Sequence, residues 1–297
     1  MSYWKQYYIA QSIADALETL ASSTENARLI AGGTDLLLDI QQGKQSPVDL
    51  LVDVSQIPEM KLIEIRNERI FLGAAVTIAE IACSPLIQKN AAALSDACSL
   101  IGGPQVRNSA TIGGNVAHAL PAADGVIALV ALDASAVIAN QDGERETTIL
   151  SLFRGPGVSS LDCKKELITG FYVNLLRAGQ GSAFARVMRP QGIALPILNM
   201  AIFLHQRNGI INTVKIAVGP AGSTPQRATR AETFLTGKSI SSDLLTAGSE
   251  EIRKSLHFRS SPYRATAGYR THLSGILFEE VFTKVWQRVS DDCSGSE

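Results

Sequence analysis

The chain has 297 residues, 45% of them hydrophobic and 19% charged, which is typical of a globular protein with room for two domains. Its 27 basic and 28 acidic residues nearly cancel, and this argues against nucleic acid as a partner because no basic field is present to neutralise phosphates. The longest apolar run, Val126–Leu132, is too short to span a bilayer.

The cysteines argue against several kinds of site. Cys83, Cys98, Cys163 and Cys293 are scattered and form no C-x-x-C pair. Their spacing argues against zinc, against an iron–sulfur cluster on this chain and against a disulfide scaffold. The start of the chain, Met-Ser-Tyr-Trp-Lys, has no apolar signal core. We therefore expect a cytoplasmic protein in a reducing compartment.

Residues 1–58 predict a small lobe of βαβ type. A capping box at Ser12–Asp15 begins a helix whose apolar residues recur at helical spacing as far as Leu20. Arg28–Ala31 reads as a strand that runs into a glycine pair. The helix that follows should begin near Thr34 and stop at Gly43, a favourable residue after a helix end. A second strand is expected at Leu50–Val54.

Residues 59–177 predict a second lobe, and Ile57-Pro58 indicates a break before it. Its expected elements are a strand at Arg69–Leu72, a capping box at Thr77–Glu80, one helix from Ser84-Pro85 to Leu100, an apolar helix at Ala122–Leu132, a hairpin at Val137–Thr148 and a strand at Leu167–Val173. Ala178–Gly181 reads as a linker.

The remainder of the chain has a different pattern. Ile197–Leu204 and Ile210–Val218 are rich in β-branched residues and are joined through Asn208-Gly209, which predicts a hairpin. Helical patterns follow at Ala228–Leu235 and near Leu244–Leu256. A final long helix is expected from Ser261-Pro262 to Val289. We expect a smaller α+β domain of a sheet covered by helices.

The stretch Ile101–Asp124 carries the most chemistry. At its centre, Thr111 and Asn115 flank a glycine pair. Glycines let the backbone approach a bulky ligand, and consecutive N–H groups in such a turn can form an anion site. A similar segment earlier in the chain, Ile30–Asp35, lies at the expected start of a helix and also has a Thr beside two glycines. Two such loops predict a cradle that grips one diphosphate from both sides.

Several common motifs are absent. There is no G-x-G-x-x-G, no H-E-x-x-H and no G-x-S-x-G, so a Rossmann site, a zinc protease and a serine hydrolase are unsupported. The four histidines (His118, His205, His257 and His272) are isolated, which favours surface or packing roles over metal ligation. The residues by themselves therefore point only to a ligand that contains a diphosphate.

Motifs along almost the whole chain resemble one known family. They are AGGTDLL at Ala31, GAAVTIAEI at Gly73, the block Ile101–Asp124, KELITGFYV at Lys165, and the later segments VKIAVGPAGSTPQRATRAETFLTGK and SPYRATAGYRTHL. In these motifs the chain resembles the FAD-binding medium subunit of molybdenum hydroxylases, the family of xanthine dehydrogenase and carbon monoxide dehydrogenase. The resemblance implies an α+β protein. It would have a p-cresol methylhydroxylase-type FAD-binding domain at residues 1–177, made of two α/β subdomains (about 1–58 and 59–177). A C-terminal α+β domain with an antiparallel sheet and helices would occupy residues 182–290.

The resemblance also implies residues that bind FAD noncovalently. Those expected around the diphosphate are Ile30, Ala31, Gly32, Gly33, Thr34, Asp35, Thr111, Gly113, Gly114 and Asn115. Asp124 would bond ribityl or ribose hydroxyls of FAD, and its alternative role is a charge at a helix N-terminus. Ile101 and Ile168 would lie near the flavin, with core packing as the alternative for each.

A cation is expected near the flavin, where it would stabilise negative charge on the reduced ring. The candidates are Arg186 and Arg189, and a solvated arginine is the alternative for either. Tyr263, Arg264 and Arg270 match the terminal motif of the family, and we interpret them as structural or interface residues.

In function, the resemblance implies an electron-transfer flavoprotein subunit of an oxidoreductase. It would accept electrons from an iron–sulfur small subunit and pass them via FAD to NAD+ or another acceptor. The molybdenum cofactor and the iron–sulfur clusters would lie on partner subunits, so the chain alone would not oxidise the organic substrate. The alternatives are a free-standing FAD-dependent oxidase or reductase of the same flavin fold, and a flavin-free scaffold.

Overall fold

The N-terminal lobe contains a parallel sheet. The structure, a computed structural model, describes residues 3–23, 26–188, 195–262 and 264–294. Strands β1 (Trp4–Ile9), β3 (Val48–Asp53) and β2 (Ala27–Ile30) form a three-stranded sheet in the order β1-β3-β2, with α1 (Ile13–Ser22) and α2 (Leu36–Gln41) as connections. Strand β1 was not predicted, because nearly all of its residues are exposed and it therefore lacks the alternation of apolar and polar residues that marks a half-buried strand.

The helix ends of this lobe lie near the predicted positions, but only half of the predicted capping box forms, because the Asp15 carboxylate accepts from the N–H of Gln11 and not from that of Ser12. The Ser12 hydroxyl accepts a hydrogen bond from the N–H of Asp15 at 3.1 Å, so α1 begins where the capping residue places it. Gly43 has a φ of 69° and donates to the carbonyl of Ile40 just after α2 ends. Helix α2 itself begins two residues after Thr34, at Leu36.

The second lobe is an antiparallel five-stranded sheet in the order β4-β5-β10-β6-β7. The strands are β4 (Ile63–Arg66), β5 (Arg69–Gly73), β6 (Ser135–Asn140), β7 (Gly143–Thr148) and β10 (Leu167–Asn174), with a small extra pair β8 (Phe153–Gly155) and β9 (Val158–Ser159). Short turns of 3₁₀-helix occur at Pro58–Lys61 and Ile149–Leu152. The hairpin predicted at Val137–Thr148 is the pair β6–β7.

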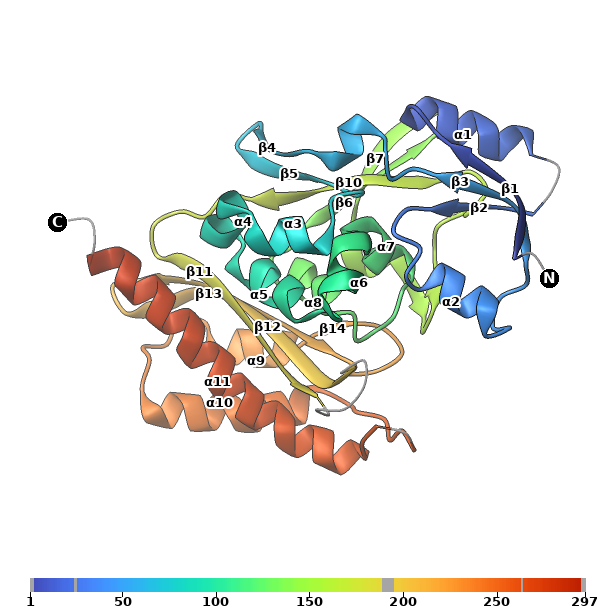
Figure 1. The fold of residues 1–297 in the computed structure, drawn as a ribbon. Coiled ribbons are helices and arrows are strands. Elements are labelled where there is room, and N and C mark those ends of the chain that lie inside the picture. Colours follow the sequence, from blue (N-terminus) through green and yellow to red (C-terminus); the bar gives the residue numbers. More distant parts are fainter. Residues whose placement is uncertain (1–2, 24–25, 189–194, 263, 295–297) are drawn as a thin grey trace.

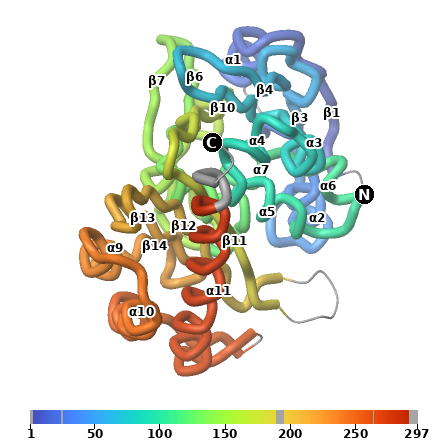
Figure 2. Tube along the Cα trace, turned by 90° about the vertical axis from the view of Figure 1, so that its left-hand side faces the viewer, coloured from blue at the N-terminus to red at the C-terminus, as the bar shows by residue number. Residues whose placement is uncertain are grey.

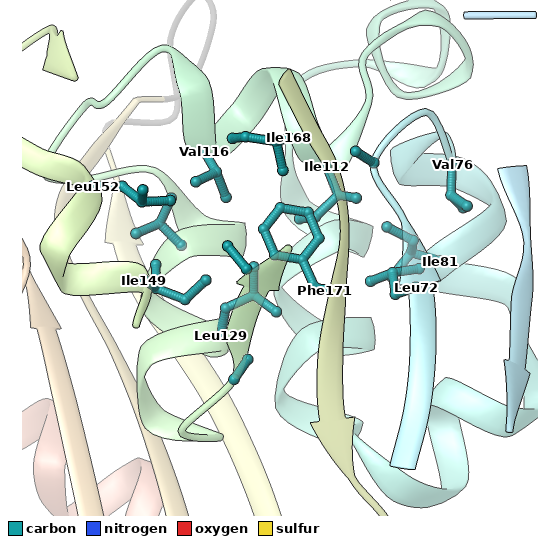
Figure 3. Packing of buried hydrophobic residues seen from close by; sticks show 14 of the residues in the cluster. Leu72, Val76, Ile81, Ile112, Val116, Leu129, Ile149, Leu152, Ile168 and Phe171 are labelled. Atoms are coloured by element: carbon teal, nitrogen blue, oxygen red, sulfur yellow. The ribbon is translucent and has the colours of Figure 1, made fainter. Parts of the chain in front are cut away.

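Helices cover one face of this sheet and separate it from the C-terminal sheet (Figure 1). They are α3 (Ile78–Cys83), α4 (Pro85–Asn90), α5 (Ala92–Leu100), α6 (Pro104–Ser109), α7 (Ile112–Ala117) and α8 (Asp124–Ala131). Figure 3 shows Phe171 of β10 packed among Ile112, Val116 and Leu129 from this helical layer.

Two predictions for the helical layer were wrong. The single helix expected from Pro85 to Leu100 is broken at Ala91, where φ is −143°. Asn90 precedes the break, and its side-chain NH2 group donates to the carbonyl of Leu86 while its Oδ1 accepts from the N–H of Leu176. The stretch 101–124 is not an irregular loop, since it contains α6 and α7. Both helices are six residues long, too short for a periodic apolar signal.

The C-terminal domain is an antiparallel sheet between two layers of helices. Strands β11 (Gln180–Met188), β12 (Pro196–Arg207), β13 (Ile210–Gly219) and β14 (Gln226–Arg227) follow in that order. Helices α5 and α8 lie on one face, while α9 (Thr229–Leu235), α10 (Ser242–Ser255) and α11 (Ala267–Ser294) belong to the other layer. Figure 2 shows α11 running along β11 and β12, with α10 beside it.

The boundaries of this domain correct two expectations. The proposed linker Ala178–Gly181 is partly strand, because β11 begins at Gln180 and Gly181 packs closely under Val289 of α11. Helix α11 begins at Ala267 rather than at Ser261. The predicted turn at Asn208-Gly209 is confirmed, with positive φ at both residues. No helix among the described residues is long and apolar enough to cross a membrane.

Candidate functional site

The two glycine-containing loops lie against each other. A Cβ added to Gly32 would fall 2.0 Å from the carbonyl oxygen of Ser109 and 2.8 Å from the Cα of Ala110. Only glycine permits this approach of one backbone to another. The loop after β2 and the segment that leads into Thr111 are therefore in direct contact, across the boundary between the two lobes.

The first loop, Ala31–Asp35, presents unused backbone donors. Gly33 has a φ of 66°, a left-handed conformation that favours glycine. Among the described residues, we find no hydrogen bond from the N–H groups of Gly32, Gly33, Thr34 or Asp35 to another group of the chain. Backbone N–H groups rarely remain unpaired when they are covered. This loop can therefore supply several adjacent donors to an anionic ligand.

The second loop corrects our expectation of a concave N–H site at Thr111–Asn115. These residues form the first turn of α7, and Thr111 is its N-terminal cap, with its hydroxyl accepting from the N–H of Gly114 at 3.2 Å. The N–H groups of Ile112, Gly113 and Asn115 also donate within the chain, to the carbonyls of Val76, Ala74 and Thr111 respectively. The backbone of this stretch is thus engaged inside the protein.

The glycine pair in the second loop has two different roles. A Cβ on Gly113 would lie 2.7 Å from both the Cβ and the carbonyl oxygen of Ala74, so Gly113 allows α7 to dock on the strand end at Ala74. Gly114 is exposed, and a Cβ there would approach only the hydroxyl oxygen of Thr111, at 3.2 Å. Gly113 is therefore required for packing, and Gly114 leaves open space at the surface.

Asn115 connects this turn to the next helix. Its Oδ1 atom is buried and has no hydrogen-bond partner among the described residues. The same atom lies 2.8 Å from where a Cβ would be on Gly125, in the first turn of α8. A buried amide oxygen without a partner is costly, so this acceptor is available to a hydroxyl or amide of a ligand.

At the start of α8, Asp124 is held by residues of the C-terminal domain. Arg186 of β11 donates to Oδ2 of Asp124 at 2.5 Å, and the amide of Asn199 of β12 donates to Oδ1 at 2.6 Å. The other guanidinium nitrogen of Arg186 donates to the carbonyl of Leu100 at 2.5 Å. Asp124 and the side chain of Arg186 are 4% and 5% exposed, so this ion pair is shielded from water. We call these three side chains the Asp124 cluster.

Burial controls the electrostatics of the Asp124 cluster. It raises the pKa of Asp124, while Arg186 and Asn199 act in the opposite direction. Burial also raises the pKa of the Cys98 thiol, and the charge of Asp124 adds to that effect. The Nε of Arg186 and the Oδ1 of Asn199 are buried without a partner among the described residues.

The two predicted apolar neighbours of the flavin differ in burial. Ile101 is half-buried where α5 ends, and Arg107 donates to its carbonyl at 3.0 Å and to that of Gly102 at 2.8 Å. Ile168 is 5% exposed in the core cluster, beside Ile112 and Val116 in Figure 3. Core packing, the alternative role, therefore describes Ile168 well. Ile101 instead follows Leu100, whose carbonyl accepts a hydrogen bond from Arg186. For both residues, contact with a flavin remains a prediction.

Several residues of the site were not predicted. Asn199, Arg107 and Ser109 contribute contacts that no motif revealed, and a lone Asn within the apolar strand LNMAI was the one available signal for Asn199. His118 was interpreted as isolated, yet its Nε2 lies 3.9 Å from Asp35 and 4.0 Å from Asp39. It therefore links α7 to α2 at the edge of the first loop. Arg189 and Tyr263 lie outside the described residues.

Contacts within the chain connect these elements. Gly32 lies against Ser109 and Ala110, which lead into Thr111, and Asn115 lies against Gly125, the neighbour of Asp124. The donors of the first loop suit an anionic diphosphate, and the acceptor of Asn115 suits a hydroxyl group. In the described residues no group of three or more His, Cys, Asp or Glu side chains could hold a metal ion.

Comparison of the sequence with known families gives two matches. Residues 3–173 match the FAD binding domain in molybdopterin dehydrogenase. Residues 182–285 match the CO dehydrogenase flavoprotein C-terminal domain.

Curated relatives align over nearly their whole length. The 6-hydroxypseudooxynicotine dehydrogenase complex subunit alpha of Paenarthrobacter nicotinovorans is 32% identical over 95% of this chain and 94% of its own. The xanthine dehydrogenase FAD-binding subunit of Escherichia coli O157:H7 is 28% identical over 94% of both chains. Among solved structures, a chain of carbon monoxide dehydrogenase from Hydrogenophaga pseudoflava is 26% identical, with a TM-score of 0.89 over 96% of this chain and 98% of that one.

Proposed function

This chain belongs to the family of FAD-binding medium subunits of molybdenum hydroxylases, and on that premise we propose that it is the electron-transfer subunit of a multi-subunit complex. It is an oxidoreductase flavoprotein subunit with FAD as its cofactor. In the proposed complex, electrons arrive from an iron–sulfur small subunit and leave to NAD+ or another acceptor. A large subunit would hold the molybdenum cofactor and oxidise the organic substrate.

The observation that carries the proposal is the first loop with its unpaired donors. Hydrogen bonds to charged groups contribute roughly 1.5–3 kcal/mol each, so a few N–H groups suffice to hold a diphosphate without a lysine. The N–H groups of Gly32–Asp35 would bind those phosphates. Gly114 would leave room for the cofactor beside α7, and Asn115 would accept from one of its hydroxyls. These residues fit FAD.

The Asp124 cluster is the second part of the proposal. FAD, when bound, supplies the redox chemistry that lets electrons enter and leave singly or in pairs. Arg186 would place a positive charge at the end of the site, and Asp124 and the carbonyl of Leu100 hold that guanidinium in one position. Because Asp124 is fully engaged by Arg186 and Asn199, a direct bond from it to FAD hydroxyls would require it to share its oxygens. We therefore assign Asp124 mainly the task of orienting Arg186.

The division of labour with partner subunits is supported by the names of the relatives of this chain. Its relatives carry names such as "medium chain" and "complex subunit alpha", so they work within complexes. The donor side of the flavin would therefore face a partner, and the substrate of the complex would depend on the large subunit.

Replacement of Gly114 by valine tests the flavin site. The added side chain would occupy the open surface beside α7, so we expect the purified protein to lose most of its FAD while its circular dichroism stays unchanged. Gly268→Val is the matched control, because Gly268 is also in the first turn of a helix with open space around it. Retention of full flavin absorbance in Gly114→Val would contradict the proposed site. Oxidation of a small organic donor by the isolated chain would contradict the dependence on partners.

A further inference from the structure

A cavity of about 600 Å³ lies between the two domains. Its lining includes Glu68 from the turn between β4 and β5, Arg177 from the segment between β10 and β11, and Thr213 of β13. Figure 1 shows the β4–β5 turn and the passage from β10 to β11 at the same side of the molecule. Gln180 also lines the cavity, and Arg186 lies six residues further along β11, roughly 20 Å away. The cavity is therefore separate from the flavin site, and cavities of this size at domain boundaries commonly hold small ligands.

The floor of the cavity is one face of the C-terminal sheet. His205 of β12 pairs with Gln180 of β11 and with Thr213 of β13, so the three side chains lie side by side across three strands. The imidazole of His205 is half-buried and makes no hydrogen bond or ion pair with another described residue. An imidazole always has a donor or an acceptor to offer, so the floor presents an unused polar group to the cavity.

A tight turn fixes the backbone of Arg177 at the edge of the cavity. Its N–H donates to Oε1 of Gln180 at 2.9 Å, and its carbonyl accepts from the N–H of Gln180 at 3.0 Å. Gly179, with a φ of 77°, belongs to this turn, and its carbonyl accepts from the N–H of Gln206 in β12 at 2.8 Å. The guanidinium of Arg177 is exposed and has no partner among the described residues. It is therefore available to a ligand.

The lining carries charges of both signs. Lys215 is not available, because its Nζ lies 2.5 Å from Oδ2 of Asp133. Glu68 is exposed, and its carboxylate has no ion-pair partner among the described residues. The strand after Glu68, β5, pairs with β10, from which the chain continues to Arg177. One unpaired carboxylate and one unpaired guanidinium therefore line the same cavity.

Apolar side chains complete the lining. Leu132 at the end of α8, Leu175 and Leu176 before β11, and Phe203 of β12 border the cavity. Contact with these side chains would favour a ligand that buries an apolar group, because such burial removes apolar surface from water. A purely polar ion would leave this part of the lining in contact with water.

From these observations we propose that the cavity binds a small zwitterion with an apolar side group, which is the chemistry of a free amino acid. The carboxylate of the ligand would pair with Arg177 and accept a hydrogen bond from His205, while its ammonium group would pair with Glu68. A simple anion would be repelled by Glu68, and a simple cation by Arg177. Because Glu68 belongs to the FAD-binding domain and His205 to the C-terminal domain, the ligand would bridge the two domains. The proposed function gives this cavity no task.

The requirement for both charges can be tested on the purified flavoprotein by isothermal titration calorimetry at low ionic strength. The probe is L-phenylalanine, and its matched comparators are 3-phenylpropionate, which lacks the ammonium group, and phenylalaninamide, which lacks the carboxylate. We expect phenylalanine to bind about tenfold or more tightly than either comparator, because each comparator loses a charge-assisted hydrogen bond. Absence of phenylalanine binding at millimolar concentration, or equal affinity for all three compounds, would overturn the proposal.

Two variants locate the charges that recognise the ligand. Arg177→Gln should weaken the binding of phenylalanine about tenfold or more. Glu68→Gln should also weaken phenylalanine, but it should strengthen the binding of 3-phenylpropionate, since a repelling carboxylate is removed. Arg207→Gln is the control, because Arg207 is an exposed arginine of β12 outside the lining, and it should change the affinity by less than about twofold. An equal change for both ligands in Glu68→Gln, or a control variant as damaging as Arg177→Gln, would contradict the proposed geometry.

A second measurement separates the cavity from the flavin site. Phenylalanine should raise the melting temperature of the protein, because it binds only the folded chain, and the increase should be smaller in Arg177→Gln. The flavin absorbance should stay the same with and without phenylalanine, and Arg177→Gln should keep its FAD. Release of FAD by phenylalanine would mean that the two ligands compete for one site and would overturn the proposal.

Discussion

The proposed flavin site combines two regions, one formed by backbone groups and the other by side chains. The loop contact between Gly32 and Ser109 is made of backbone, and its donors are N–H groups that carry no charge of their own. The Asp124 cluster is made of side chains, and it encloses an ion pair with about 5% exposure. The first region is therefore sensitive to the addition of any Cβ atom. The second region is sensitive to the loss of either charge.

This difference explains why the two regions suit different parts of a cofactor. Backbone donors bind an anion in a geometry that no side-chain rotation can change, which suits a diphosphate. A buried arginine held by a carboxylate and a carbonyl provides a positive charge with fixed orientation, which suits a redox ring whose charge changes. The comparison leads to predictions in which each region fails in its own way.

The largest effect is expected when the buried ion pair is broken. Arg186→Met leaves Asp124 buried without its countercharge, which costs about 3–5 kcal/mol of unfolding free energy, to be measured by urea denaturation. The double variant Arg186→Met/Asp124→Asn should recover part of this loss, because no buried charge then remains. If Arg186→Met were no less stable than the wild type, the pair would not hold the two domains as described.

The backbone region should respond to a single methyl group. In Gly32→Ala the new Cβ would overlap the carbonyl of Ser109, a backbone atom that cannot move aside cheaply, so we expect a loss of about 1–3 kcal/mol and a reduced FAD content. Gly103→Ala is the control, because its nearest neighbour would be the Gln105 side chain at 3.4 Å. Equal stability and equal flavin content in both variants would mean that the two loops can separate without consequence.

A smaller effect is expected from the cap that engages the second loop. Thr111→Val keeps the shape of the side chain but removes the acceptor for the N–H of Gly114, which should cost about 1 kcal/mol and weaken FAD binding a few-fold. Ser84→Ala removes the cap of α4 and should cost a similar amount without affecting FAD. Fluorescence titration with FAD distinguishes the two variants, and an identical affinity in both would contradict a role for α7 in the site.

The smallest effect concerns pH and a second carboxylate between the domains. Burial raises the pKa of Asp96, but hydrogen bonds from Arg288 and Lys284 outweigh it, and the net shift is downward. A carboxylate with a lowered pKa stabilises the fold above its unfolded pKa of about 3.9, and that contribution is lost as pH falls through the lower folded value. Asp96→Asn should therefore cost on the order of 1 kcal/mol near neutral pH. The variant should also lose less stability than the wild type when the pH is lowered, which thermal melts between pH 3 and 7 would reveal. An unchanged acid profile would contradict this assignment.

The opposite shift at Asp124 sharpens the comparison between the two carboxylates. Because burial raises the pKa of Asp124, the charged form of Asp124 destabilises the fold at pH values above the pKa of the unfolded chain. The charged form of Asp96 stabilises the fold in the same pH range. Both carboxylates contact cations of the C-terminal domain, and they differ mainly in access to water. The same residue type thus serves as an orienting group at Asp124 and as a stabilising contact at Asp96.

Local signals predicted much of the secondary structure. The capping residues Ser12 and Thr77 and the turn at Asn208-Gly209 act through neighbours in the chain, so the sequence alone was sufficient to place them. The exposed strand β1 and the short helices α6 and α7 were missed, because they lack a periodic buried face. The break at Ala91 was also missed, and the neighbouring Asn90 accepts a hydrogen bond from Leu176, a residue distant in sequence.

By itself, the sequence determined that the chain is a flavoprotein subunit, because ordered motifs along its length identify the family and glycine pairs mark where backbone must approach closely. Only the tertiary structure decided which glycines are needed for packing and which charged residues pair with each other. The N–H groups of Ile112–Asn115 are used inside the protein, and Asp124 is held by Arg186 and Asn199 from another domain. Such pairings depend on residues far apart in the chain meeting in space, and local sequence patterns do not encode those meetings.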